Sequence, residues 1–227
     1  MKPELVIFDM DGLMFGTEKV YYEECFETCR KHGIKVNEEI AYASIGTTQA
    51  STDNWFEIPD GLKVDIDKLL DGAIDSSIEK MCKKGIPIKP GLFDLLDTLD
   101  ELGIPKVIAT STTRKRTEKL LKSAGIYDRF VIIVCGDEIS RGKPYPDIFL
   151  KVCSKINIEP KAVIVFEDSN NGTLAAKNAG IPCVMVPDLV QPSDESAAYA
   201  LAVLENLHQA AALMRTYFVE VKENSSK

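Results

Sequence analysis

Two aspartates separated by a single residue are of a type and spacing that suit metal and phosphate chemistry. Asp9 and Asp11 directly follow the apolar run 5–8, and Gly12 comes next. Two carboxylates close together at the end of a buried strand repel each other, so such a site requires protons, hydrogen-bond donors or a cation. Mg²⁺ meets this requirement with oxygen ligands and leaves positions open for a phosphate. The alternative is an ordinary turn in which Gly12 supplies a positive φ.

The same pattern recurs at the ends of later apolar runs. Thr110 and Ser111 follow KVIA, Glu167 and Asp168 follow AVIVF, and Lys143 stands directly before a proline between them. The carboxyl ends of parallel strands form the ligand-binding edge of a sheet, so we expect these side chains to converge on the two aspartates. There Thr110 and the amide of Ser111 can hold phosphate oxygens near a helix N-terminus. Lys143 can offset the remaining negative charge.

The acids have complementary uses at such an edge. Asp9, Asp168 and the carbonyl of Asp11 can hold Mg²⁺, and Glu167 can support these ligands through water or a hydrogen bond. Asp9 can then attack phosphorus as a nucleophile, which divides one difficult displacement into two easier ones.

Ordinary structural roles remain open for several of these residues. Residues 110–112 could cap a helix that begins at 114, and Lys143 could be a solvated surface lysine. Glu167 and Asp168 could cap the helix that follows them. The sheet edge would have no binding or catalytic function only if all of these independent structural roles applied together.

The apolar pattern predicts an α/β fold, a doubly wound parallel sheet with an inserted α-helical domain. Apolar runs alternate with amphipathic segments in the second part of the chain, which indicates right-handed crossovers between parallel strands. No strand is predicted between 33 and 86. We therefore predict a core of residues 1–15 and 87–227 and a helical domain of residues 16–86, with Thr17 capping its first helix. Strands are predicted at 5–8, 106–110, 131–134, 162–166 and 183–186, and helices at 17–32, 37–43, 47–55, 64–83, 92–102, 114–124, 146–156, 171–179 and 200–219.

The composition is that of an ordinary globular protein. The chain has 227 residues, 27% of them charged, and a formal net charge of −8 with scattered Lys and Arg, which argues against nucleic acid or a membrane surface as partner. We expect no signal peptide, because residues near the N-terminus lack its succession of basic, apolar and small residues, and no apolar run approaches the roughly 18 residues needed to span a bilayer. The six cysteines contain no CxxC pair, so we expect buried reduced thiols, with half a metal site as the alternative for Cys25 and Cys29. We expect a cytoplasmic monomer.

Taken in order, the motifs resemble the four signatures of the haloacid dehalogenase-like phosphohydrolase superfamily. These are DMDG near the N-terminus, Thr/Ser after the second core strand, Lys-Pro before a helix, and FEDSNNG. The likeness extends over essentially the whole chain and is closest to the beta-phosphoglucomutase-like and small phosphatase branch. It implies a Rossmann-like core, a helical cap domain inserted after the first motif, and Mg²⁺ as cofactor.

The resemblance also implies roles for individual residues. Asp9 matches the nucleophile that becomes an aspartyl phosphate, and Asp11 matches the general acid and base. Thr110 and Lys143 match the phosphate-binding positions, and Asp168 matches the metal ligand, with a glutamate beside it. The dehalogenase and phosphonatase branches lack the second acid of the first motif, so Asp11 favours phosphate-ester chemistry.

Substrate choice is where the chain departs from its relatives. Beta-phosphoglucomutases resemble one another in a cap histidine, a cap arginine and a cap lysine, whereas this chain has Tyr21, Gln49 and uncharged or acidic residues at 71–73. Cap cations would clamp the second phosphate of a mutase intermediate, so hydrolysis is favoured. Tyr21 and the turn containing Gly46, Thr47 and Gln49 are the expected substrate contacts on the cap.

We therefore predict a Mg²⁺-dependent phosphatase of small phosphorylated metabolites, such as sugar phosphates, that forms an aspartyl-phosphate intermediate. A sugar phosphomutase with different cap residues and a non-catalytic phosphate-ligand sensor remain as alternatives. Two short links, at Phe15-Gly16 and 85–90, suit a hinge that closes the helical domain over the sheet edge.

Overall fold

A six-stranded sheet at the centre of the protein confirms the predicted α/β fold. The computed structural model describes residues 3–44 and 55–224, and its main sheet has the order β5-β4-β1-β6-β7-β8. Every neighbouring pair is parallel, and the order reverses at β1, as in a doubly wound sheet. The strands are β1 (Leu5–Phe8), β4 (Lys106–Thr110), β5 (Ile133–Cys135), β6 (Val163–Glu167), β7 (Cys183–Met185) and β8 (Ala202–Val203).

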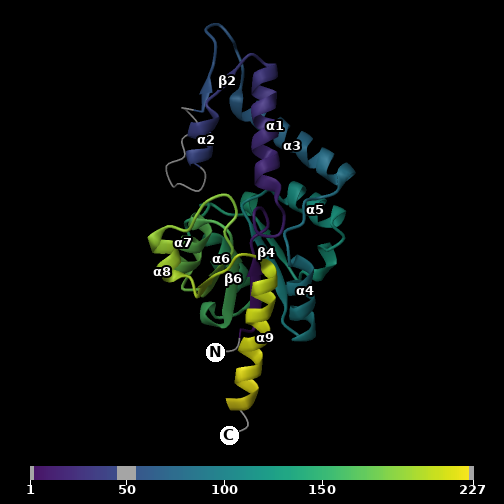
Figure 1. Ribbon diagram of the computed structural model, residues 1–227, viewed down its shortest axis with the longest axis vertical. Coiled ribbons are helices and arrows are strands. Elements are labelled where there is room, and N and C mark those ends of the chain that lie inside the picture. Colours follow the sequence, from purple (N-terminus) through teal and green to yellow (C-terminus); the bar gives the residue numbers. More distant parts are fainter. Residues whose placement is uncertain (1–2, 45–54, 225–227) are drawn as a thin grey trace.

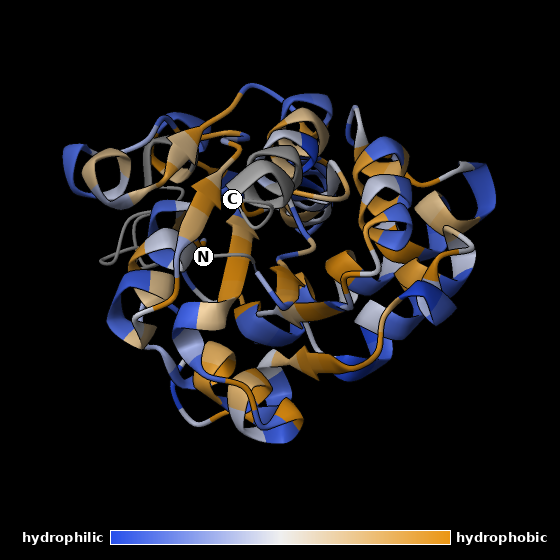
Figure 2. Ribbon diagram, turned by 90° about the horizontal axis from the view of Figure 1, so that it is seen from below, coloured by the Kyte–Doolittle hydropathy of each residue, from blue (hydrophilic) through white to orange (hydrophobic). Residues whose placement is uncertain are grey.

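Helices cover both faces of this sheet, which explains the continuous apolar run of β1. Val6 and Phe8 pack in the core formed with α4, α5 and α9, whereas Leu5 and Ile7 pack in the core formed with α6 and α7. Figure 1 shows α4 and α5 on one side of the sheet and α6, α7 and α8 on the other, and Figure 2 shows hydrophobic strands surrounded by helices with hydrophilic outer faces. These helices are α4 (Leu92–Glu101), α5 (Arg114–Ser123), α6 (Asp147–Ile156), α7 (Asn170–Ala179), α8 (Asp194–Tyr199) and α9 (Leu207–Asn224).

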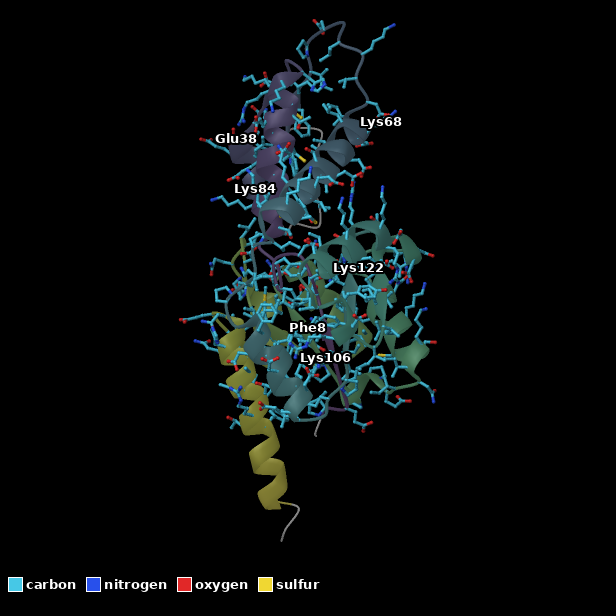
Figure 3. The ribbon with its side chains drawn as sticks, turned by 90° about the vertical axis from the view of Figure 1, so that its right-hand side faces the viewer. Phe8, Glu38, Lys68, Lys84, Lys106 and Lys122 are labelled. Carbon is cyan, nitrogen blue, oxygen red and sulfur yellow. The ribbon has the colours of Figure 1, made fainter. Side chains whose placement is uncertain are left out.

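Residues 16–86 are here called the inserted segment, and the described elements of this segment lie beyond the carboxyl ends of the strands (Figure 1). Figure 3 shows Phe8 within the body of the sheet and Glu38, Lys68 and Lys84 in the inserted segment. Its two long helices, α1 and α3, pack against each other. Its described elements are α1 (Thr17–Lys31), β2 (Lys35–Val36), α2 (Glu38–Ser44), β3 (Phe56–Glu57) and α3 (Ile66–Lys84).

The inserted segment contains two short strands that the sequence did not predict. β2 and β3 pair antiparallel, with Lys35 opposite Glu57 and Val36 opposite Phe56. Two-residue strands have too little alternation to produce a sequence signal. The predicted helix 47–55 lies almost wholly outside the described residues.

Two links connect the inserted segment to the core, and they run side by side. The amide of Gly16 donates a hydrogen bond to the carbonyl of Pro87 at 2.8 Å, and the amide of Lys89 donates one to the carbonyl of Met14 at 3.0 Å. Entry and exit are thus joined by backbone hydrogen bonds.

The predicted cap of the helix at 17–32 and the predicted beginning of the last helix are wrong. Gly16 is the N-cap of α1, and Thr17 is its first helical residue, with a hydroxyl that bonds Asp11 instead of capping the helix. The last helix begins at Leu207, because the residues before it form α8 and β8. A helix of six residues and a strand of two leave no room for a periodic pattern.

All six cysteines lie within the described residues, and none forms a disulfide; all but Cys82 are buried, as expected for reduced thiols. Among the described helices, none has both the length and the apolar character needed to cross a bilayer.

Candidate active site

A pocket of about 210 Å³ lies at the carboxyl edge of the sheet, where β1, β4 and β6 end. Seven predicted site residues line it together, namely Asp9, Asp11, Tyr21, Thr110, Ser111, Lys143 and Asp168. Glu167 is fully buried behind them and contacts Lys143. Gly46, Thr47 and Gln49, the other predicted substrate contacts, lie outside the described residues.

Three further residues line the pocket: Glu18, which sequence reasoning did not place in the site, and Thr112 and Ser169, which it placed at the sheet edge without a role. Glu18 stands one helical turn before Tyr21 on α1, so the i, i+3 spacing could have indicated it. Burial raises the pKa of Glu18 to about 7, and the nearby Asp11 carboxylate adds to this rise. Thr112 and Ser169 directly follow predicted site residues.

Lys143 joins acids that come from two neighbouring strands. Its Nζ donates to Asp9 Oδ1 at 2.5 Å, to Glu167 Oε1, and to the carbonyl of Ala109 at 3.4 Å. Its side chain is only 7% exposed, which excludes the surface-lysine alternative. Burial lowers the pKa of Lys143, but the Asp9 and Glu167 carboxylates together hold it above its ordinary value.

The same cluster changes the acidity of Asp9. Burial raises the pKa of Asp9 to about 8; Lys143 opposes this rise, and Glu167 and Asp11 increase it. One lysine is therefore too little positive charge for the acids around it. A second cation, such as a metal ion, would favour the ionised form of Asp9.

The turn from β6 to α7 is built around Glu167. Its Oε2 accepts hydrogen bonds from the amides of Asp168 and Ser169, both at 3.0 Å. Ser169 itself caps α7, because its hydroxyl oxygen accepts from the amide of Gly172. The capping role that was open for Glu167 and Asp168 thus belongs to Ser169. A Cβ at Gly172 would lie 1.9 Å from Glu167 Cδ, so only glycine leaves room for this buried acid.

Asp11 accepts three hydroxyl hydrogen bonds. Thr17 and Tyr21 donate to its Oδ1 at 2.5 and 3.1 Å, and Thr112 donates to its Oδ2 at 2.7 Å. The first two donors belong to the inserted segment and the third to the core. The contacts of this carboxylate therefore depend on how the inserted segment sits over the sheet.

The hydroxyl residues 110–112, at and after the end of β4, line the pocket and do not cap the next helix. The hydroxyl oxygen of Thr110, which is buried, accepts a hydrogen bond from the amide of Thr112 at 3.1 Å. Thr113 is the N-cap of α5 and makes no side-chain cap; instead Asp137 accepts from the amide of Arg114 at 3.0 Å. The helix-cap alternative for 110–112 is therefore excluded.

The donor set fits a hard divalent cation. Among the described residues that line the pocket, Lys143 is the one cation, against the carboxylates of Asp9, Asp11, Glu18 and Asp168. Burial raises the pKa of Asp168 well above its ordinary value, and its acidic neighbours raise it further. Carboxylate and carbonyl oxygens are the ligands that Mg²⁺ prefers. A bound cation would relieve this excess of negative charge.

Gly12 lets the first loop approach Asp168. Its φ is +84°, and a Cβ at this position would lie 2.1 Å from Asp168 Oδ2. A side chain here would displace the carboxylate, so the glycine serves the site as well as the turn.

A different trio brings its ligand atoms within 4.8 Å of one another in the described part of the chain: Cys135, Asp137 and Glu138. Its acids have other partners, because Glu138 pairs with the Arg114 guanidinium and Asp137 accepts from the Arg114 amide. In the pocket, by contrast, the carboxylate of Asp11 is turned to hydroxyl donors. The expected role of the Asp11 backbone carbonyl as a metal ligand stays a prediction.

Comparison with known proteins gives a consistent result. The family model described as haloacid dehalogenase-like hydrolase matches residues 6–186. The chain is 31% identical over 189 residues to the phosphorylated carbohydrates phosphatase of Thermotoga maritima, covering 78% of this chain and 82% of that protein. It is 34% identical over 194 residues to (DL)-glycerol-3-phosphatase 2 of Arabidopsis thaliana, covering 81% and 79%. The crystal structure of CbbY from Rhodobacter sphaeroides in complex with phosphate superposes with a TM-score of 0.78 at 26% identity, covering 91% of this chain and 95% of that one.

Proposed function

The chain belongs to the haloacid dehalogenase-like hydrolase family, and we propose that it is a Mg²⁺-dependent phosphatase of small phosphorylated metabolites, sugar phosphates among them. The observation that carries this proposal is the buried cluster of Asp9, Lys143 and Glu167. Asp9 and Lys143 of this cluster line one pocket together with Asp11. The cluster combines a nucleophile, a cation for the phosphate and a second acid. The relatives named for phosphorylated carbohydrates and glycerol 3-phosphate support the substrate class.

The proposed reaction has two halves. In the first, a carboxylate oxygen of Asp9 attacks phosphorus, the bond from phosphorus to the ester oxygen breaks, and Asp11 gives that oxygen a proton. In the second, Asp11 takes a proton from water, the water oxygen attacks the aspartyl phosphate, and the carboxylate of Asp9 leaves. The sum is one ester and one water converted to an alcohol and inorganic phosphate.

The remaining pocket residues bind and neutralise the phosphoryl group. Lys143 can pair with phosphate oxygens from its place beside Asp9, and Thr110 and Ser111 can donate from the loop after β4. Asp9, Asp168 and the carbonyl of Asp11 would hold Mg²⁺, which supplies positive charge for the phosphate. Glu167 acts from behind, by fixing Lys143 and the amides after β6.

We assign the inserted segment the role of a cap, and its chemistry favours hydrolysis. Tyr21 reaches the pocket with a neutral hydroxyl. Among the described residues of the inserted segment that line the pocket, Glu18 and Tyr21, neither is a cation. A mutase has to hold a second phosphate, for which cations are the natural partners.

Replacement of the nucleophile tests the proposal. Asp9→Asn should lower phosphate release from glycerol 3-phosphate by at least about a thousandfold, because an amide oxygen cannot form the intermediate. Asp137→Asn is the matched control, since it removes an exposed carboxylate near the same sheet edge. Full activity in Asp9→Asn, with unchanged unfolding, would contradict the aspartyl-phosphate mechanism.

Two further assays separate the alternatives. Beta-glucose 1-phosphate with a bisphosphate activator would yield glucose 6-phosphate in a mutase and free phosphate in a hydrolase. A non-catalytic sensor would bind phosphate esters and release no phosphate from any of them, and this result would overturn the proposed activity.

A further inference from the structure

A second cavity, of about 220 Å³, lies in the inserted segment next to the active-site pocket. Glu18 and Tyr21 line both spaces, so the two are neighbours. We propose that this cavity binds an aromatic or similarly flat, apolar group at the far end of the substrate. The proposal rests on the phosphatase function above and makes its substrate class narrower.

Aromatic rings dominate the walls of the cavity. Tyr22 and Phe26 of α1 have ring centroids 6.1 Å apart, Tyr22 and Trp55 are 6.0 Å apart, and Trp55 and Phe56 are 6.2 Å apart. Aliphatic residues of α3, Leu70 and Ile74, also line the cavity. Rings at such spacing can take a further flat ring in stacked or edge-to-face contact. The complete lining is Glu18, Tyr21, Tyr22, Cys25, Phe26, Trp55, Phe56, Leu70 and Ile74.

The size and charge of the cavity restrict the kinds of chemical group that it can bind. Its volume of about 220 Å³ exceeds the ~150 Å³ of apolar cavities that admit benzene. Among its described lining residues, Glu18 is the one charged group, and no cation is present. A second phosphate or a carboxylate would therefore meet repulsion, and a bare sugar would find few partners for its hydroxyls. A flat apolar ring matches both the shape and the lining.

Tyr21 fixes the direction in which the substrate would extend. Its hydroxyl donates to Asp11 Oδ1 at 3.1 Å, while the residue also lines the apolar cavity. A phosphoryl group beside Asp9 and a ring among Tyr22, Phe26 and Trp55 would lie on either side of Tyr21. The reacting ester bond would then lie near Asp11, which has to protonate its oxygen.

A pair of esters tests the proposal. The wild-type enzyme with Mg²⁺ should hydrolyse 2-phenylethyl phosphate with a kcat/KM at least about tenfold higher than glycerol 3-phosphate, because burial of a ring adds binding energy. Trp55 is the single tryptophan of the chain, so its fluorescence reports occupancy of the cavity without any turnover. It should change saturably with 2-phenylethyl phosphate in the non-hydrolysing Asp9→Asn variant and remain unchanged with glycerol 3-phosphate.

A polar substitution in the wall tests the same point from the protein side. Leu70→Asn should lower kcat/KM for 2-phenylethyl phosphate roughly tenfold and leave glycerol 3-phosphate within about twofold. Leu62→Asn is the matched control, because Leu62 is exposed and does not line the cavity. Thermal unfolding of each variant verifies that the fold persists.

The possible results distinguish a failure of the cavity assignment from a failure of the proposed phosphatase function. Equal kcat/KM for both esters, or equal losses on both in Leu70→Asn, would overturn the cavity assignment and leave the phosphatase standing. If the wild-type enzyme released phosphate from neither ester, the proposed phosphatase function would be refuted. Trp55 fluorescence would then be the test of whether the cavity binds the ring. A saturable change that Leu70→Asn weakens would support it, and no change would refute it.

Discussion

The hydroxyl of Tyr21, on α1 of the inserted segment, donates a hydrogen bond to Asp11 Oδ1 of the core at 3.1 Å. Thr17, from the same helix, donates to the same oxygen, whereas Thr112 of the core donates to the other one. The proposed general acid is thus held between the two parts of the protein. Movement of the inserted segment would change the hydrogen bonds of Asp11 and thereby couple closure to proton transfer.

Removal of the tyrosine hydroxyl should affect turnover and spare the fold. Tyr21→Phe loses one hydrogen bond to Asp11 and keeps the ring in place, so kcat should fall about three- to tenfold. Steady-state phosphate release from glycerol 3-phosphate measures the effect. In an Asp11→Asn background the same change should have little further effect, since the two groups act together. Tyr22→Phe, in the adjoining cavity, is the control; a loss of kcat as large as that of Tyr21→Phe would argue against a specific role for Tyr21.

Loss of the central cation should destabilise the protein when no metal is bound. Lys143→Met leaves Asp9 and Glu167 buried without their partner, which costs about 3–5 kcal/mol of unfolding free energy near neutral pH. The loss should shrink as the pH falls, because Asp9, whose pKa burial already raises, can then take up a proton in the folded state and become neutral. Urea unfolding at several pH values measures this dependence.

The control for Lys143 is an exposed lysine in a surface ion pair. Lys122 pairs with Glu118 one helical turn away, and its side chain is 58% exposed. Lys122→Met should therefore change the unfolding free energy by less than about 1 kcal/mol. Mg²⁺ should restore part of the stability of Lys143→Met, and a loss that Mg²⁺ leaves unchanged would contradict the charge balance proposed here.

The core and its site were predictable because strong patterns coincide there. Strands buried on both faces give continuous apolar runs, and the residues after them must meet at one edge of a parallel sheet. Asp9, Thr110 and Asp168 could thus be placed together before any coordinates were known. Lys143 lies in the loop between β5 and α6 and not at a strand end, so its place at this edge was predicted from its position between the motifs and then from the family resemblance.

Other features had no signal of this kind. The strands β2, β3 and β8 have two residues each, too few for any period to appear. Threonine is a common helix-capping residue, so the sequence favoured Thr17 as a cap, but its hydroxyl donates a hydrogen bond to Asp11 instead. The aromatic cavity brings residues of α1 together with Trp55 and residues of α3, and only the packing of the inserted segment unites them.

Gly12 and Gly33 provide a matched pair for the close approach to Asp168. Both have positive φ, +84° and +73°, so an alanine at either position costs about 1–2 kcal/mol of backbone strain. Only at Gly12 would the added Cβ meet Asp168, since nothing lies within 4 Å at Gly33. Gly12→Ala should therefore raise the Mg²⁺ concentration needed for half-maximal activity, and Gly33→Ala should leave it unchanged. Urea unfolding verifies that the strain is similar; equal Mg²⁺ responses would exclude a role for this contact in metal binding.

Protons should compete with Mg²⁺ for the site. Carboxylate ligands bind a metal ion in their ionised form, and burial raises the pKa of Asp9 to about 8 and that of Asp168 well above its ordinary value. As the pH falls from about 8 to about 6, the half-saturating Mg²⁺ concentration should rise by up to about tenfold per pH unit for each proton displaced. Asp168→Asn removes one of these protons, so its overall affinity should be weaker and its rise with falling pH shallower. Phosphate release at saturating Mg²⁺, measured at each pH, separates this competition from proton transfer by Asp11. A half-saturating concentration that stays constant over the range would mean that Mg²⁺ displaces no proton from these acids, and the site would then have to be held by other groups.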